Sequence, residues 1–145
     1  PMTILSHAAP LVKRFEGCKL TAYKCPAGVW TIGYGHTGPE VKEGLVWTQA
    51  QADAALDRDM QTALAEARKV VSSTLTDNQW AAITSFVFNL GIGNFRTSTL
   101  LKKINARDLA GALAEFARWN KAGGQVLAGL TARRAAEAAL FREAV

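Results

Sequence analysis

The sequence predicts an α+β fold with a small β-hairpin region near the N-terminus and helices elsewhere. Apolar residues recur at helical spacing along most of the chain, and one segment over 19–36 instead interleaves aromatic and β-branched residues with glycine. A chain of 145 residues with 49% hydrophobic residues can form one core. We expect one domain over 1–145. Its small lobe covers about 12–60, its helical lobe covers about 61–145 and packs with the first helix, and a groove between the lobes is the expected binding site.

The first helix is predicted over Leu5–Phe15, and Gly17 follows it as a C-terminal stop. This helix delivers Glu16 at its end. In residues 19–36 the strand-forming residues are separated by proline and glycine, which is typical of short strands joined by a tight turn. We therefore predict a β-hairpin here, with a three-stranded sheet as the alternative.

The remainder of the chain is predicted to be helical. Thr48 with Gln51, and Thr76 with Gln79, fit the capping box that satisfies free amides at a helix start. The first box opens an alanine-rich helix that reaches about Val71, and the second opens the almost wholly apolar WAAITSFVFNLG, which indicates a buried central helix. Three further helices are predicted over Thr97–Asn105, Asp108–Trp119 and Leu130–Ala144.

The charge and composition limit the function classes. Seventeen Lys and Arg residues against twelve Asp and Glu give a net charge of +5, which favours a polyanionic partner or is simply a solvated surface. The basic residues are scattered rather than striped along one helix, which argues against nucleic acid as the partner. Neither of the two cysteines has a zinc-like spacing with histidine, so no metal is expected. The N-terminal residues do not form a secretory signal, and no apolar run is long enough to span a membrane.

Glu16 is the candidate general acid. Glycoside hydrolysis needs a carboxylic acid that protonates the leaving oxygen and a second group on the opposite face of the sugar. A helix end that faces a hairpin can supply both groups. Glu16 also follows the apolar Phe15, and partial burial there favours the protonated form that an acid needs.

Several segments together resemble the phage lysozymes, or endolysins, of glycoside hydrolase family 24. They are FEG, TAYKCPAGVWTIGYGHTG, SFVFNLGIGNFRTSTLL, ARWNKAGG and GLTARR, and they extend over nearly the whole chain. The family pattern is a Glu, eight residues, an Asp, five residues, a Thr, and then Gly-x-Gly-His; here Glu16, Cys25, Thr31 and His36 occupy the Glu, Asp, Thr and His positions. The resemblance implies a lysozyme-like fold and cleavage of the β-1,4 bond between N-acetylmuramic acid and N-acetylglucosamine in bacterial peptidoglycan. It also implies that no metal or organic cofactor is required.

Cys25 departs from this pattern, because the family has a carboxylate at its position. A thiolate is nucleophilic and can also balance developing positive charge. We therefore expect Cys25 to act as nucleophile or anionic stabiliser while Thr31 positions the attacking water. The alternative is an inert Cys25 in a weak or inactive peptidoglycan-binding module. A strand between Cys18 and Cys25 would hold them about 20 Å apart, so the hairpin and a disulfide between them exclude each other. A further hypothesis is that an oxidising envelope joins Cys18 to Cys25 in an alternative, inactive fold until the bond is reduced; otherwise Cys18 is simply a small buried apolar residue.

The resemblance also implies supporting and binding residues. It implies that Arg133 in the last helix pairs with the catalytic glutamate, and Arg134 is the fallback if the register differs by one. His36 is expected to support the site as a hydrogen-bonded structural residue. Phe88 and Ser98 correspond to groove-lining residues that bind substrate, although Phe88 also fits a core position and Ser98 a helix cap.

The resemblance also implies where the protein acts and with which partners. The protein would be made in the cytoplasm of the bacterial host, act as a monomer on the cell wall in the periplasm, and cause host cell lysis. A holin-type pore would give it access without binding it. A lytic transglycosylase, which leaves an anhydro product end, is a neighbouring enzymatic alternative.

Overall fold

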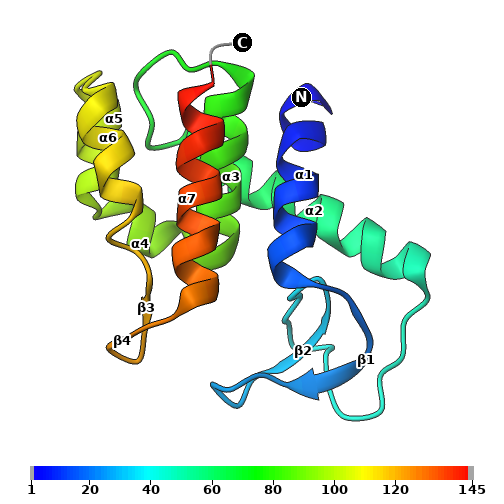
Figure 1. The fold of residues 1–145 in the computed structure, drawn as a ribbon. Helices are drawn as coiled ribbons and strands as arrows, with labels where there is room; N and C mark the ends of the chain where they lie inside the picture. Colours follow the sequence, from blue (N-terminus) through cyan, green and yellow to red (C-terminus); the bar gives the residue numbers. More distant parts are fainter. Residues whose placement is uncertain (1, 144–145) are drawn as a thin grey trace.

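The computed structural model describes residues 2–143, and its first helix leads directly into a small β-hairpin (Figure 1). Helix α1 covers Met2–Glu16 and ends at Gly17, whose φ of +66° suits glycine. Strands β1 (Lys19–Lys24) and β2 (Trp30–Gly33) then pair in antiparallel fashion. The predicted hairpin is therefore confirmed. The alternative third strand is reduced to one isolated bridge, Thr21 with Val46, on the other side of β1.

Both predicted capping boxes are present. Thr48 caps α2 (Gln49–Arg68) and Thr76 caps α3 (Asp77–Leu90), and in each the threonine hydroxyl and the glutamine three residues later satisfy each other's backbone amides. Helix α2 ends three residues before the predicted Val71. It passes behind α1 in this view, packs against α3 and links the hairpin region to the helical lobe (Figure 1).

The C-terminal helices begin and end within a few residues of their predicted limits, because serine and aspartate act as caps. Ser98 and Asp108, both predicted as parts of helices or their starts, accept amide hydrogen bonds as N-caps. The predicted residue Ala144 lies outside the described residues. The helices are α5 (Thr99–Asn105), α6 (Leu109–Phe116) and α7 (Ala128–Arg142).

Two short elements were not predicted from the sequence. Helix α4 (Ile92–Arg96) follows Gly91, and strands β3 (Lys121–Ala122) and β4 (Gln125–Val126) form a second hairpin. Five residues are too few to show a helical period. The hairpin turns at two consecutive glycines with positive φ, which is the signal that a two-residue turn leaves in a sequence.

Helix α3 is the centre of the helical lobe and packs against α1, α2 and α7 (Figure 1). On one side, the rings of Phe95, Phe116 and Trp119 all meet Phe86 edge to face at 5.7–5.9 Å. On the other side, apolar residues of α1 and α2 form a second cluster around Ile4 and Met60. This packing places the C-terminal end of α1 beside α7. Within residues 2–143 no helix is both long and apolar enough to cross a membrane.

Candidate active site

Glu16 lies at the last position of α1 and is held by an arginine from α7. Its side chain is 18% exposed, and Arg133 Nη1 donates to its Oε2 at 2.5 Å. Arg133 itself is 3% exposed, so this contact is a charge-assisted hydrogen bond away from bulk water. The carboxylate therefore has a defined position at the junction of the two lobes.

The other side of Glu16 is covered by backbone. Gly35 has a φ of +72°, and a Cβ built at this position would lie 2.5 Å from Glu16 Oε1. Only glycine allows the loop after β2 to approach the carboxylate this closely. The motif Gly-Tyr-Gly before His36 was the sequence signal for this approach, but the contact itself depends on how the loop folds onto α1.

Cys25 lies in the turn between β1 and β2. Its amide donates to Val29 O at 3.0 Å and its carbonyl accepts from Gly28 N at 2.8 Å, which closes the turn. Hydrogen bonds from the backbone at Val29 and Ala27 lower the pKa of the Cys25 thiol below its ordinary value. The turn therefore favours the thiolate at this partly exposed position.

The two cysteines are both free and lie at opposite ends of β1. Cys18 precedes the strand and is exposed, whereas Cys25 follows it. The six-residue strand between them holds them well beyond disulfide distance. In this fold the hairpin and a Cys18–Cys25 bond therefore exclude each other.

Thr31 and Tyr23 face each other across the hairpin next to Cys25. Thr31 is buried, and its hydroxyl donates to Val29 O at 3.0 Å, so the lone pairs of its Oγ1 can accept from a water. Burial raises the pKa of Tyr23, and the negative charges of Glu16 and Cys25 raise it further. Both charges are therefore close enough to Tyr23 to affect the ionisation of its hydroxyl.

His36 connects the small lobe to α2. Its Nδ1 lies 2.7 Å from Asp59 Oδ2, its Nε2 lies 2.9 Å from Glu40 Oε2, and its ring packs on Trp47 at 5.3 Å. Burial by itself lowers the pKa of His36, but the hydrogen bonds that its ring donates to Glu40 and Asp59 outweigh this effect and raise the pKa above its ordinary value. Both ring nitrogens are thus engaged, and the residue holds the loop that carries Gly35.

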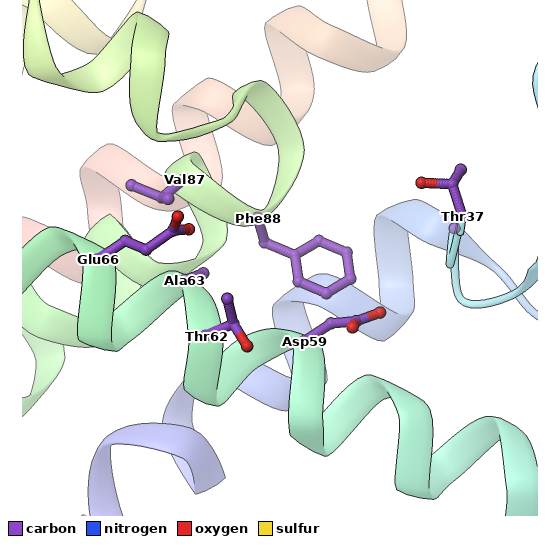
Figure 2. Close-up of a pocket in the computed structure, with 8 residues that line it drawn as sticks. Thr37, Asp59, Thr62, Ala63, Glu66, Val87 and Phe88 are labelled. Carbon is purple, nitrogen blue, oxygen red and sulfur yellow. The ribbon is translucent and has the colours of Figure 1, made fainter. Parts of the chain in front are cut away.

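Phe88 lines a pocket of about 210 Å³ beside the acid. Figure 2 shows its ring extending from α3 into the space between α2 and Thr37, with Asp59 and Glu66 on the α2 side. Gly35 also lines this pocket, so the pocket adjoins the carboxylate of Glu16. Phe88 is partly exposed and is packed only at the edge of the core.

Ser98 lies outside the pocket that Phe88 lines. Its Oγ accepts from Leu101 N at 3.0 Å and donates to Phe95 O at 2.7 Å, and the residue is buried as the N-cap of α5. It lines a different pocket, of about 300 Å³, together with Trp119. The structure therefore does not bring Phe88 and Ser98 into one pocket.

Sequence reasoning did not identify the polar groups behind Arg133. Ser85 of α3 and Glu137 of α7 are fully buried, and both contact the Arg133 guanidinium. The available signals were a serine inside an apolar helix and a glutamate four residues after Arg133. Neither signal distinguishes a buried position from an exposed one without the packing of α7 on α3.

An acid at a helix end, an arginine that orients it, and a hairpin that faces it with a nucleophilic group are the parts of a small two-lobed glycosidase. The model of the phage lysozyme family matches residues 13–137, and the chain belongs to that family. It is 48% identical to an endolysin of Acyrthosiphon pisum secondary endosymbiont phage 1, over 99% of this chain and all of that protein.

Solved structures are similar over almost the whole chain. The muramidase domain of SpmX from Asticaccaulis excentricus superimposes with a TM-score of 0.87 at 38% identity, and the match covers 94% of this chain and 95% of that one. A P22 lysozyme variant superimposes with a TM-score of 0.83 at 34% identity, covering 95% and 97%. The lysozyme-like fold predicted from the sequence is therefore confirmed.

Proposed function

We propose that this protein is an endolysin that hydrolyses the β-1,4 bond between N-acetylmuramic acid and N-acetylglucosamine in peptidoglycan, with Glu16 as its general acid. The observation that carries this proposal is the position of the Glu16 carboxylate, held between Arg133 and the backbone at Gly35. Family membership supports the reaction class. The glycan would lie in the groove between the hairpin and the helical lobe, with Phe88 in contact with it.

Glu16 gives its proton to the glycosidic oxygen as the bond to the sugar carbon breaks, so the leaving sugar departs as an alcohol. Positive charge then develops on the sugar ring. Cys25, as a thiolate, either attacks the sugar carbon or stabilises this charge from the opposite face. The amides that lower the pKa of Cys25 favour this role, because they increase the thiolate fraction at neutral pH.

Water completes the reaction. Thr31 Oγ1 already donates its proton to Val29 O, so it would accept a hydrogen bond from the attacking water and orient it. The water oxygen bonds to the sugar carbon and its proton passes to the Glu16 carboxylate, which restores the acid. Where Cys25 has attacked, the carbon–sulfur bond breaks in this step and Cys25 leaves as the thiolate. None of these residues calls for a metal or an organic cofactor.

The biological setting follows from the proposed reaction. Peptidoglycan is the partner, and cleavage in the periplasm after synthesis in the host cytoplasm would lyse the cell. We infer a holin-type pore as the route of access, and a monomer as the active species. Ser98 is retained as a candidate substrate-binding residue in the second pocket, next to Trp119.

The test is clearing of purified peptidoglycan by the wild type, Glu16→Gln, Cys25→Ser and Cys25→Asp, each with and without reductant. We expect the wild type and Cys25→Asp to clear and the other two variants to fail. Cys18→Ser is the matched control, because it removes a thiol from the far end of the same strand. Product ends that carry reducing sugar indicate hydrolysis, whereas anhydro ends indicate a lytic transglycosylase.

Two results would contradict the proposal. If the wild type pellets with peptidoglycan but never releases sugar ends, the protein is an inactive binding module. If Cys25→Ser clears as fast as the wild type, the thiol has no catalytic role. A wild type that clears only with reductant would point to the disulfide between Cys18 and Cys25.

A further inference from the structure

A buried polar cluster lies directly behind the contact between Arg133 and Glu16. Arg134 and Glu137 have no exposed side-chain surface, and Ser85 of α3 is also buried. Charged side chains are rarely buried this completely unless they are paired. The mechanism proposed above uses none of these three residues, so their presence inside the core calls for another explanation.

Glu137 connects the members of this cluster. Its Oε2 accepts from Ser85 Oγ at 2.5 Å and from Arg134 Nη2 at 3.0 Å, and it lies 3.4 Å from Arg133 Nε. Its Oε1 lies 2.7 Å from Arg134 Nε, a close ion pair without the alignment of a hydrogen bond. One carboxylate thus contacts both arginines and the serine.

Arg133 is held on three sides as a result. Nη1 contacts Glu16, Nη2 donates to the carbonyl oxygen of Ser85 at 3.3 Å, and Nε faces Glu137. The guanidinium is planar, so fixing Nε and Nη2 also fixes the direction of Nη1. Glu137 and Ser85 therefore determine where the arginine meets the acid.

The cluster is also balanced in charge. Arg133 and Arg134 supply two positive charges, which Glu16 and Glu137 balance. Burial raises the pKa of Glu137 above its ordinary value and lowers that of Arg134, and the direct contacts of Glu137 with Arg134, Ser85 and Arg133 oppose its rise. We expect Glu137 to be ionised at neutral pH, so that it shares the positive charge that Arg133 presents to Glu16.

We propose that Glu137 is a positioning residue for the acid: through Arg133 it fixes the Glu16 carboxylate, and its charge keeps that carboxyl able to take up and give a proton. This inference rests on the proposed function of Glu16. It assigns a catalytic consequence to a buried residue that does not touch the substrate.

The charged or titratable groups around Glu16 limit what else could act on it. From α7 they are Arg133 and Arg134, and from the hairpin it is Tyr23. Helix α3 contributes the uncharged Ser85 to the cluster. Removing the charge of Glu137 therefore leaves the two arginines less balanced near Glu16, and the protonated acid becomes harder to form.

The experiment is a pH–rate profile of peptidoglycan hydrolysis by the wild type, Glu137→Gln and the control Glu143→Gln. Glu143 is exposed just after α7, so the control makes the same change in net charge outside the core. A general acid loses activity as pH rises, so the alkaline limb of the profile reports on it. The two carboxylates lie on either side of the Arg133 guanidinium, about 8 Å apart, so at an effective dielectric constant of about 20 Glu137→Gln should move this limb to lower pH by about 1.5 units. The control should leave it in place.

The same experiment must show that each variant is folded, since Glu137→Gln leaves Arg134 buried without its anion. The double variant Arg134→Met with Glu137→Gln removes both charges of that pair, and thermal unfolding shows whether each protein is folded. Ser85→Ala provides an independent variant, because it removes the hydroxyl that accepts from Nε and Nη2 of Arg133 and donates to Glu137, without changing any charge. It should lower kcat with little change in KM and leave the limb in place.

The outcomes separate the two proposals. If the wild type does not hydrolyse peptidoglycan, the proposed function fails. If the wild type hydrolyses with an alkaline limb, and folded Glu137→Gln and Ser85→Ala match it in limb position and kcat, the role of Glu137 is refuted while the function of Glu16 stands.

Discussion

Gly35→Ala is the sharpest test of the site geometry. The new methyl group would lie 2.5 Å from Glu16 Oε1 and 3.2 Å from its Cδ. An ordinary contact between such atoms is about 3.5 Å, so the carboxylate must move by about 1 Å. That movement disturbs the 2.5 Å contact with Arg133, and a displacement of this size in an active site can cost about a hundredfold in rate.

Gly44→Ala is the matched control. Gly44 has a similar φ of +89°, but an added Cβ meets nothing within 4 Å. Both variants should lose about 1–2 kcal/mol of unfolding free energy from the backbone alone, seen as a fall of a few degrees in Tm. Only Gly35→Ala should lose about a hundredfold in the initial rate of peptidoglycan clearing. The reasoning is refuted if the two variants, both folded, clear at the same rate.

Three further predictions concern stability and reactivity. The raised pKa of His36 stabilises the fold fully below the ordinary histidine pKa, and this stabilisation is lost as pH rises through the pKa in the folded protein. Asp59→Asn should therefore lower the unfolding free energy at pH 5.5 by no more than about 1 kcal/mol, since the pair is partly exposed, and by much less at pH 9; the fall in Tm at each pH measures this. An equal loss at both pH values would contradict this. Thr76→Ala should cost about 1 kcal/mol in urea unfolding, because it removes the α3 capping box, and an unchanged midpoint would count against that cap. Alkylation of Cys25 by iodoacetamide should show a midpoint pH below that of an ordinary thiol and should stop clearing; a modified protein that remains active would argue against the thiolate.

Much of the fold could be predicted because its signals are local. The capping boxes at Thr48 and Thr76 and the apolar period of α3 need only nearby residues to act. The hairpin likewise follows from a local turn closed between Cys25 and Val29. The short helix α4 and the hairpin β3–β4 were not predicted, because elements of two to five residues show no period.

The candidate site could likewise be predicted from the sequence only in part. The sequence alone predicted Glu16, Cys25 and Thr31 as the catalytic candidates, because their spacing along the chain matches the family pattern. It left Arg133 and Arg134 as alternatives for the contact with Glu16. Adjacent residues on a helix point about 100° apart, so only the packing of α7 against α3 and α1 decides that Arg133 meets the acid while Arg134 turns into the core against Phe86.

Tertiary structure also decided which polar residues are buried. Ser98 became a helix cap, Gly35 became the backbone contact of the acid, and Glu137 became the buried anion behind Arg133. A sequence determines spacing and local conformation by itself, because those depend on neighbouring residues. Burial and partnership depend on residues far apart in the chain, as in the 117 positions that separate Glu16 from Arg133, and they exist only once the helices have packed.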